Sequence, residues 1–516
     1  MKKTRLLLTL LLLLSLLAGC GQEPTPPTPD IPDEPVITPV PPEEEVSVNT
    51  ITLPDFFSLP YNPDDTLDPL TCRDSAQLTL APLLYESLFM LDETFQPVEI
   101  LCDGYESNNE HSVWIFRIRD SVLFSDGSPL TAADAAAALN RARETDRYRA
   151  RLSDIIKVAH SGNTVTVTLS SPNAMFPALL DIPIVKKGTE RNSAPTGTGP
   201  YRFVKENGAA MLIPAETRRG TDLLPVESIP LTECPNTTAL YHRFSSRDIQ
   251  LLVTDLTGPD AFNPTGNISI RDANTTVLQF IGFNTAHPLF SSAALRNALG
   301  LGIDRATLVN TYLAGHAVAA QSPVSPATPL YPDVLDMDYS RPAFLEAMTA
   351  AGYQNGTIHE VTLLVNSENN FKVSAAHYLA DALSACDIKI RVRALPWEEY
   401  TAALEAGDFD LYYGEVKLTA DWDLSQLVST EGSLNFGGYA SSAMDVLLSG
   451  YAAAQEPKSA LRSLCRYLQT QAPILPLCFK CSSVVTESGV VEGLSPTAAD
   501  PFHALGNIII NLSKSN

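Results

Sequence analysis

The sequence predicts α/β domains, because helices and strands are mixed along the chain and one segment has the element order of a largely parallel sheet. Residues 113–119 and 164–169 alternate apolar and polar side chains, as half-buried strands do. Between residues 361 and 413 the pattern is strand, helix, strand, helix, strand. That order builds crossover connections on a parallel sheet, whose ligands usually collect beyond the carboxyl ends of the strands. The segment that follows residue 413 is therefore a candidate site.

Local signals define the individual elements. Thr131, with Asp134 three residues later, is a capping signal for an alanine-rich helix that begins at residue 132. The glycines of residues 197–199 favour a tight turn over a phosphate-binding loop, because Pro200 follows and a third glycine is missing. The remaining expected elements are strands at 361–365, 388–392 and 409–413, and helices at 132–143, 295–314, 374–385 and 397–406.

The first twenty residues have the pattern of an export signal. Lys2, Lys3 and Arg5 precede an apolar run over residues 6–17, which is shorter than the roughly 17–25 residues of a membrane-spanning helix. The run ends in Leu-Ala-Gly-Cys at Cys20, which resembles the lipobox of bacterial lipoproteins. We therefore expect residues 1–19 to be a signal peptide, rather than a short membrane anchor. By the same resemblance Cys20 becomes lipidated and holds the protein on the extracytoplasmic face of the cell membrane.

A proline-rich segment separates Cys20 from the rest of the chain. Nine prolines stand between residues 24 and 42, among acidic residues and without an apolar period. Such a composition favours an extended, solvated tether, which we place at residues 20–45. The body that follows, from residue 46 to residue 516, is longer than one hydrophobic core usually supports, so two or three domains are expected.

The charge balance narrows the range of partners. The chain has 59 acidic and 35 basic residues and a formal net charge of -24. Nucleic acids and anionic membrane surfaces both attract clustered Lys and Arg, so neither is an expected partner. After Cys20 every long apolar stretch is interrupted by charge or proline, and no second membrane span is evident.

Cysteine and histidine patterns give no support for a metal or redox site. Seven cysteines remain after Cys20, and Cys478 and Cys481 have Cys-x-x-Cys spacing. They fall on an expected strand, where positions three apart point to opposite faces, so buried or incidental thiols are favoured over metal or redox chemistry. The eight histidines include no pair at i, i+4, and we expect no metal site and no cofactor.

Known catalytic signatures are missing. The sequence contains no Gly-x-Ser-x-Gly elbow, no His-Glu-x-x-His and no Gly-x4-Gly-Lys-Ser/Thr loop. We therefore expect a protein that is not an enzyme. A lipid-anchored secreted hydrolase stays open as an alternative, because two carboxylates at catalytic separation could occur anywhere in so acidic a chain.

Five short blocks follow one another between residues 53 and 494. They are Thr66-Leu67-Asp68-Pro69 with Leu84-Tyr85-Glu86-Ser87-Leu88; Trp114 to Asp120 with Phe124-Ser125-Asp126-Gly127-Ser128-Pro129 and Thr131-Ala132-Ala133-Asp134; Gly197-Thr198-Gly199-Pro200-Tyr201; Phe283-Asn284-Thr285 with Ala294-Leu295-Arg296-Asn297-Ala298-Leu299 and Ile303-Asp304-Arg305; and Ala472-Pro473-Ile474-Leu475-Pro476-Leu477. Together and in this order they resemble the family 5 extracellular solute-binding proteins of bacterial ABC importers, which take up dipeptides and oligopeptides.

The resemblance implies a fold and a function. The fold would be the large three-domain form of the two-lobed periplasmic-binding-protein-like architecture. Two lobes would close on a peptide or a similar small solute and deliver it to ABC permease and ATPase subunits, with the protein acting as a monomer. A sensor's ligand subunit, without a transporter, is the other alternative. The implied division is lobe I at 46–82, 170–277 and 488–516, an inserted small domain at 83–169, and lobe II at 278–487.

The resemblance also implies ligand-binding residues on both lobes. The loop after Leu-Asp-Pro, where relatives pair with peptide backbone, corresponds here to Arg73, Asp74 and Ser75. On the other side, relatives carry a Trp-x-Ala-Asp-Tyr-x-Asp-Pro-like segment whose aspartate holds the α-ammonium of the peptide. Here Asp421 matches that aspartate, although the spacing is about two residues longer and the proline is missing. The residues expected on this side are Tyr413, Gly414, Glu415 and Asp421, with Trp397 and Trp422 as apolar walls.

Overall fold

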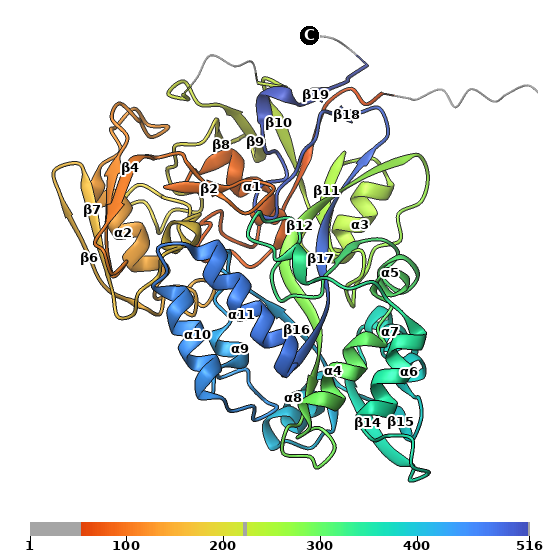
Figure 1. Ribbon diagram of the computed structural model, residues 1–516. Helices are drawn as coiled ribbons and strands as arrows, with labels where there is room; N and C mark the ends of the chain where they lie inside the picture. The colour runs from red at the N-terminus through yellow and green to blue at the C-terminus, as the bar shows by residue number, and fades with distance from the viewer. Residues whose placement is uncertain (1–52, 220–223, 514–516) are drawn as a thin grey trace, which may run out of the picture. The chain divides into compact units, whose positions relative to one another are not determined.

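Two long antiparallel strands, β12 (Ile268–Phe283) and β17 (Ile474–Glu487), form the spine of the fold. The computed structural model describes residues 53–219 and 224–513 (Figure 1). β12 and β17 pair over their whole length, except for a break between Asn274 and Leu278 and a second irregularity at Gln279 and Phe280. The expected signal peptide, Cys20 and the tether lie outside the described residues.

The spine belongs to a seven-stranded sheet, called here the central sheet. Its order is β11-β17-β12-β16-β14-β15, with β13 paired to β17. β14 pairs in parallel with both β15 and β16, whereas β12 pairs antiparallel with β16. The strands 361–365, 388–392 and 409–413 are thereby confirmed, the last beginning two residues later than expected. The strands that complete this sheet are β11 (Leu251–Thr254), β13 (Ala317–Ala319), β14 (His359–Asn366), β15 (Ile388–Leu395) and β16 (Leu411–Lys417).

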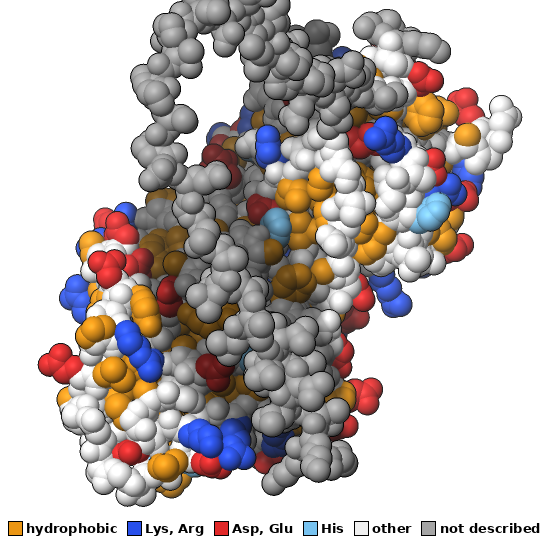
Figure 2. Space-filling model, turned by 90° about the vertical axis from the view of Figure 1, so that its right-hand side faces the viewer, with side chains coloured by type: hydrophobic (Ala, Val, Ile, Leu, Met, Phe, Trp, Pro, Cys, Tyr) orange, Lys and Arg blue, Asp and Glu red, His pale blue; other side chains and the backbone are white. Residues whose placement is uncertain are grey.

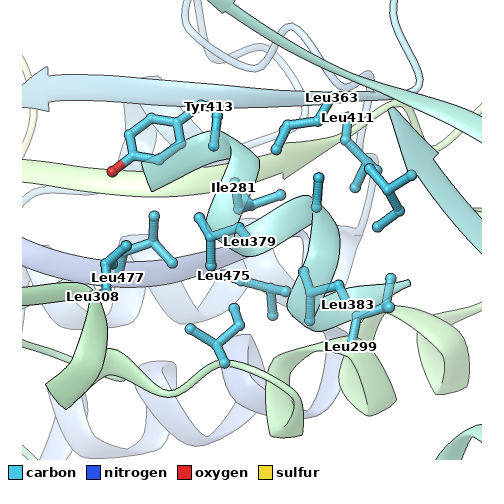
Figure 3. Packing of buried hydrophobic residues seen from close by; sticks show 14 of the residues in the cluster. Ile281, Leu299, Leu308, Leu363, Leu379, Leu383, Leu411, Tyr413, Leu475 and Leu477 are labelled. Carbon is cyan, nitrogen blue, oxygen red and sulfur yellow. The ribbon is translucent and has the colours of Figure 1, made fainter. Parts of the chain in front are cut away.

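Helices cover both faces of the lower part of the central sheet. On one face, Leu379 and Leu383 of α7 (Asn370–Leu383) pack with Ile281, Leu363 and Leu475 from three strands (Figure 3). On the other face, a second core joins α8, α10 and α11 to side chains of the same strands. The helices around this sheet are α4 (Ala293–Leu301), α5 (Arg305–Thr307), η2 (Leu308–Tyr312), η3 (Asp333–Leu335), α6 (Arg341–Ala350), α8 (Trp397–Ala406), α9 (Ser425–Val428), α10 (Ser442–Ala452) and α11 (Pro457–Gln471).

One expected helix is divided. Residues 295–314 were expected to form a continuous helix, but α4 ends at Leu301 with Gly302 as its C-cap. Asp304 then caps a new helical start through its side chain, which accepts from the Thr307 amide at 3.0 Å. The apolar spacing continues through the break, so periodicity alone could not locate it.

A four-stranded antiparallel sheet, the small sheet, has the order β4-β5-β7-β6 and is covered by α2 (Ala132–Ala142). The expected capping box is confirmed, because Thr131 accepts from the Asp134 amide and the Asp134 carboxylate accepts from the Thr131 amide. The elements around this sheet are β2 (Phe89–Leu91), β3 (Pro97–Glu99), β4 (Cys102–Ser107), β5 (Val113–Ile118), β6 (Ile155–Ser161), β7 (Thr164–Leu169) and η1 (Phe176–Leu179).

A third sheet, the amino-terminal sheet, has the order β1-β10-β9-β8 and packs with α1 (Ser75–Leu84). Val484 of the spine joins the same core, so β17 contributes to this core as well as to the two cores beside the central sheet. The remaining elements are β1 (Leu59–Tyr61), β8 (Tyr201–Glu206), β9 (Ala209–Pro214), β10 (Ile229–Glu233), α3 (Thr237–Ser245), β18 (Val491–Glu492), η4 (Leu505–Asn507) and β19 (Ile509–Ile510).

The described cysteines have no disulfide partners. Six of the seven are buried, and Cys386 is exposed. Cys478 and Cys481 both lie on β17, as expected, and burial raises the pKa of Cys481 to about 12, which keeps its thiol protonated. In the same described part of the chain, no cluster of His, Cys, Asp and Glu could hold a metal ion.

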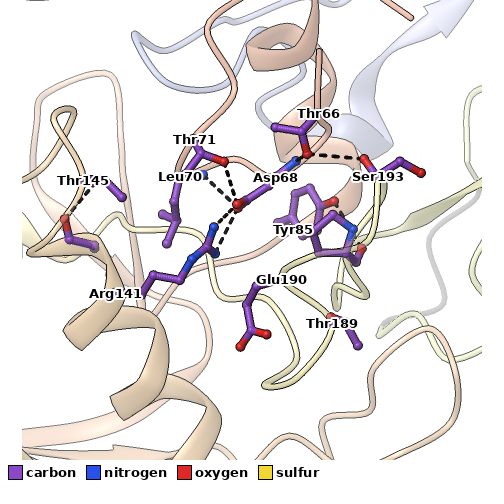
Figure 4. Close-up of polar contacts among 12 residues, drawn as sticks. Thr66, Asp68, Leu70, Thr71, Tyr85, Arg141, Thr145, Thr189, Glu190 and Ser193 are labelled. Atoms are coloured by element: carbon purple, nitrogen blue, oxygen red, sulfur yellow. Dashed lines mark hydrogen bonds and ion pairs between the residues drawn. The ribbon is translucent and has the colours of Figure 1, made fainter. Parts of the chain in front are cut away.

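A buried ion pair joins α2 to the loop before α1 (Figure 4). Asp68 is 2% exposed and accepts hydrogen bonds from the Leu70 amide at 3.2 Å and from the Thr71 hydroxyl at 2.7 Å. Both terminal nitrogens of Arg141 also donate to its carboxylate. The aspartate of the Leu-Asp-Pro block therefore connects two parts of the chain and does not face solvent.

We predict that Asp68→Asn destabilises the protein by about 2–3 kcal/mol, because the amide replaces the buried carboxylate that pairs directly with the Arg141 guanidinium. Urea unfolding monitored by circular dichroism measures the change. Asp126→Asn is the matched control, since Asp126 pairs with Lys186 in an exposed ion pair and its loss should cost less than about 1 kcal/mol. Equal losses for the two variants would contradict the structural role of Asp68.

Candidate ligand-binding site

The break in the spine is held by side chains. The Thr275 hydroxyl donates to the Lys480 carbonyl at 2.6 Å, and the Thr276 hydroxyl donates to the Leu418 carbonyl at 2.6 Å. Residues 275–277 lie between the two stretches of β12 that pair with β17. At this point the threonine hydroxyls, in place of backbone amides of the ladder, donate to backbone carbonyls. Both parts of the spine can therefore stay ordered while its geometry changes at this point.

A buried lysine occupies the same level of the spine. The Lys480 side chain is 4% exposed, and its ammonium pairs with Asp255, which follows β11, and lies 3.8 Å from Glu415 of β16. Glu415 also accepts a hydrogen bond of 2.8 Å from the Gln279 amide. Glu415, expected among the ligand-binding residues, is thus already bonded to residues of β12 and β17. Its expected role in ligand binding stays a prediction.

Asp421 lies in the loop after β16 and is buried. One carboxylate oxygen accepts from the Thr419 hydroxyl at 2.5 Å and from the Asp423 amide at 3.3 Å. The other accepts from the side-chain amide of Asn173, which precedes η1, at 2.8 Å. Desolvation raises the pKa of Asp421, and the hydrogen bond from Thr419 opposes that rise. The residue expected to hold an ammonium group thus bonds a donor from a distant part of the chain.

The aromatic residues expected beside Asp421 lie in different environments. Trp422 is fully buried, with Phe95 and Phe479 edge-on to its ring at centroid distances of 5.5 and 5.9 Å. Its backbone φ of 56° lies in the left-handed region, which is uncommon for a bulky residue. Trp397, by contrast, is 57% exposed at the start of α8. In the described structure Trp422 therefore presents no surface to a ligand, and Phe95 fills the place beside it.

Tyr413 and Gly414 are buried within β16. The Tyr413 hydroxyl donates to the side-chain carbonyl of Gln279 at 2.8 Å, which fixes the ring against β12. At Gly414 a Cβ atom would collide with the ring of Phe280, so the glycine permits close approach of the two strands. Both residues contribute to the sheet in this structure, and their expected contact with a ligand stays a prediction.

The amino-terminal set forms the start of α1. Asp74 caps the helix by accepting from the Ala76 amide at 2.8 Å, and its other oxygen accepts from the Asn62 side chain at 2.9 Å. Arg73 and Ser75 are exposed on either side of it. Ligand contact by these three residues also remains a prediction, with Arg73 and Ser75 the two that face solvent.

Three cations that the sequence analysis did not identify lie near both expected sets. Arg147, after α2, donates from Nη2 to the Cys72 carbonyl at 2.5 Å, next to Arg73. Arg151 pairs with Asp181, stands 5.8 Å from the Tyr148 ring and interacts electrostatically with Asp421. The third is Lys417 at the end of β16, and we call Arg147, Arg151 and Lys417 the cationic group. The signal in the sequence was the run of five arginines between residues 141 and 151 of an acidic chain.

The cationic group stands out from the general charge distribution. Over the face in Figure 2, acidic and basic side chains are interspersed among the described residues. In the cationic group, positive charges approach one another instead: burial and the charges of Arg151 and Arg147 all lower the pKa of Lys417. Lys417 is exposed to solvent. Its side chain is therefore crowded by neighbouring protein atoms but still reached by water.

Two pockets lie among the described residues. One, of about 610 Å³ including its open mouth, lies where the Asp92–Glu93 turn, the spine residues Arg271, Asp272 and Asn274, and the segment 494–498 meet. The other, of about 520 Å³ measured in the same way, lies between α4 and α11 and includes Arg305. Only the first borders the break in the spine, and it therefore adds a polar opening to the region of the candidate site.

No described helix has both the length and the apolar character needed to cross a membrane.

Comparison with known proteins agrees with this architecture. Residues 96–435 match the family described as bacterial extracellular solute-binding proteins, family 5 Middle. The glutathione-binding protein GsiB of Salmonella typhi is 24% identical over 404 residues, which cover 71% of this chain and 76% of that protein. GsiB of Pectobacterium atrosepticum is 25% identical over 399 residues, which cover 71% of this chain and 75% of that protein.

Solved structures share the fold. The periplasmic murein tripeptide binding protein MppA, in its unliganded open form, is 17% identical with a TM-score of 0.72, covering 89% of this chain and 98% of that chain. HbpA2 from Haemophilus parasuis is 18% identical with a TM-score of 0.72, and the match covers 90% of this chain and 100% of that chain. The oligopeptide-binding protein AppA from Bacillus subtilis, in complex with a nonapeptide, is 18% identical with a TM-score of 0.60, covering 89% and 99%.

These likenesses confirm the α/β, two-lobed fold of the large periplasmic-binding-protein type. The matched segment spans most of the described residues and includes the small sheet, β12 and β16. The chain belongs to the bacterial extracellular solute-binding proteins of family 5.

Proposed function

We propose that this protein is the substrate-binding lipoprotein of an ABC importer, which captures a peptide or a similar small solute and delivers it unaltered to permease and ATPase subunits. The observation that carries the proposal is the spine. β17 contributes Leu475 and Leu477 to one core and Val484 to another, and its pairing with β12 is interrupted between them. Two bodies joined by such strands can close on a ligand that contacts both.

The proposed lobes follow the expected division, with lobe I at 46–82, 170–277 and 488–516, a small domain at 83–169 and lobe II at 278–487. Support comes from the separate sheets and from the position of the break at residues 275–277, next to the boundary between lobes I and II. The protein acts as a monomer and has no catalytic role. GsiB relatives are named for glutathione, so a small peptide of that size is a reasonable first ligand to test.

In this proposal Asp421 takes part in ligand capture. Its carboxylate bonds Asn173 in the described structure, and the amide of Asn173 is a neutral N–H donor in the position that a ligand ammonium could take. An ammonium group would form a charge-assisted and therefore stronger hydrogen bond than the neutral amide. Ligand binding would then replace one contact across the lobes by a tighter one.

We predict that Asp421→Asn weakens binding of reduced glutathione at least about tenfold, because the carbamoyl group removes the charge that would pair with the ammonium. Isothermal titration calorimetry measures the affinity. Asp423→Asn, an exposed carboxylate in the same loop, is the matched control and should bind as the unmodified protein does. Unchanged affinity of Asp421→Asn, with unchanged thermal stability, would remove Asp421 from the site.

The transport role itself has a direct test. Native mass spectrometry of gently purified protein should detect a bound small solute, and the solute released by denaturation should have the same mass as the solute that was bound. A solute converted to a product during incubation would contradict simple capture and favour the hydrolase alternative. Genes for permease and ATPase subunits beside this one would favour an importer over a sensor.

The lipid anchor is a separate proposal that rests on the residues around Cys20. We predict that the full-length chain partitions with the membrane fraction of a bacterial host and that Cys20→Ala releases it as a soluble protein. The reason is that a thioether-linked lipid requires the cysteine sulfur, whereas the tether and body contain no other expected anchor. Retention of Cys20→Ala in detergent-extractable membranes would show that the apolar segment is itself the anchor.

A further inference from the structure

The pocket between α4 and α11 is separate from the residues expected to bind the solute. Its volume is about 520 Å³ including the open mouth. Every residue that lines it falls between Asn297 and Pro476, inside the range expected for lobe II. Asn297 of α4 is joined to α11, because its side-chain amide donates to the Gln469 carbonyl at 2.6 Å. The pocket is therefore a hollow within one part of the chain and not a gap between the expected lobes.

Arg305 brings a positive charge into this pocket. Its Nε donates to the Pro476 carbonyl at 2.9 Å and to the Ala320 carbonyl at 3.1 Å. Among residues 53–219 and 224–513, Nη2 of Arg305 donates no hydrogen bond and the guanidinium makes no ion pair. Burial lowers the pKa of Arg305 to about 10, so the group stays protonated at neutral pH.

The unpaired nitrogen of Arg305 is accessible from the pocket. Nη2 has no partner in the described residues but is not sealed off from solvent, so a molecule in the pocket can reach it. A guanidinium that is largely removed from water and contacts only neutral carbonyls has lost solvation without gaining a counter-charge. An anion in the pocket would supply that charge.

The rest of the lining adds acceptors and apolar surface. The side-chain oxygens of Asn297 and Gln469 accept no hydrogen bond in the described part of the chain, although both side-chain nitrogens donate. Leu301, Leu468 and Leu475 form apolar walls. A concave, mainly apolar site with a few polar groups of fixed position is the usual form of a small-molecule site.

We propose that this pocket binds a second small molecule, distinct from the transported solute, and that its ligand is a hydroxy carboxylic acid with a short apolar chain. The carboxylate would accept from Arg305, in a charge-assisted hydrogen bond. The hydroxyl would donate to the free oxygen of Asn297 or Gln469, and the chain would lie against the leucines. The inference goes beyond the proposed function and does not depend on it.

The pocket also borders the spine. Pro476, whose carbonyl accepts from Arg305, pairs with Phe280 at the second irregularity between β12 and β17. A ligand bonded to Arg305 would therefore contact the strand that enters the core of the amino-terminal sheet. Because such a ligand binds the folded chain, its binding should also raise the melting temperature.

The experiment compares 2-hydroxy-4-methylpentanoate with its neutral amide, 2-hydroxy-4-methylpentanamide, by isothermal titration calorimetry with the intact protein. We expect the acid to bind at least about tenfold more tightly than the amide, because only the acid pairs with the guanidinium. Arg305→Gln should abolish that preference. Arg466→Gln, which changes an exposed arginine of α11, is the matched control and should keep it. Equal affinities for acid and amide, or a preference that survives in Arg305→Gln, would overturn the proposal.

A second variant covers the structural part of Arg305, whose Nε bonds two backbone carbonyls. Leu301→Trp fills the pocket from α4 and leaves Arg305 in place. The acid should then neither bind nor raise the melting temperature, whereas it should stabilise the unmodified protein and Arg466→Gln. Acid binding that is unchanged in a folded Leu301→Trp protein would place the ligand elsewhere and overturn the proposal.

The same titration separates this pocket from the solute site. The acid should bind Asp421→Asn as it binds the unmodified protein, because Asp421 does not line the pocket. Loss of acid binding in Asp421→Asn, with Arg305→Gln unaffected, would show that the acid occupies the solute site. If the acid binds through Arg305 while reduced glutathione and other peptides do not bind at all, the second site stands and peptide capture is contradicted.

Discussion

The pairing of β12 with β17 is the constraint on which the rest of the structure depends. Every part that could contact a solute is connected through these strands: the central sheet is built on them, and β17 enters the core of the amino-terminal sheet. The longer of the two interruptions of this pairing lies where threonine hydroxyls bond backbone carbonyls beside it. Each of the two strands runs without a gap from one body into the other, but the hydrogen bonds between the strands are interrupted. Such a connection can hold two bodies together while the angle between them changes.

The charged residues near the break in the spine differ in how they are paired. Lys480 is buried among Asp255 and Glu415, which come from different strands, and it fixes the centre of the spine by ion pairs that need no solute. In the cationic group Arg151 pairs with Asp181, whereas no ion pair of Lys417 occurs among the described residues. The buried charges at the centre of the spine are thus paired within the protein itself.

Much of the fold could be predicted from the sequence because it is encoded locally. The strands 361–365 and 388–392 alternate clearly, and the Thr131 capping box needs only residues three apart. The division of the helix over 295–314 could not be found this way, since the apolar spacing runs through Gly302. The candidate site was harder still: Arg151 and Lys417 are 266 positions apart in the sequence, and no local pattern relates them. Trp422 was expected to face a ligand, but its side chain is buried in a core to which Phe95, from a distant part of the chain, contributes.

That contact between Phe95 and Trp422 has an optical consequence. The indole of Trp422 is buried in an apolar contact between two separate parts of the chain, called here the seam. The protein has only two other tryptophans. Any movement that parts the seam must admit water to the ring, and indole emission shifts to longer wavelength in a polar environment. The molecule thus contains its own fluorescent gauge of whether the two sides are together or apart, without the attachment of a dye.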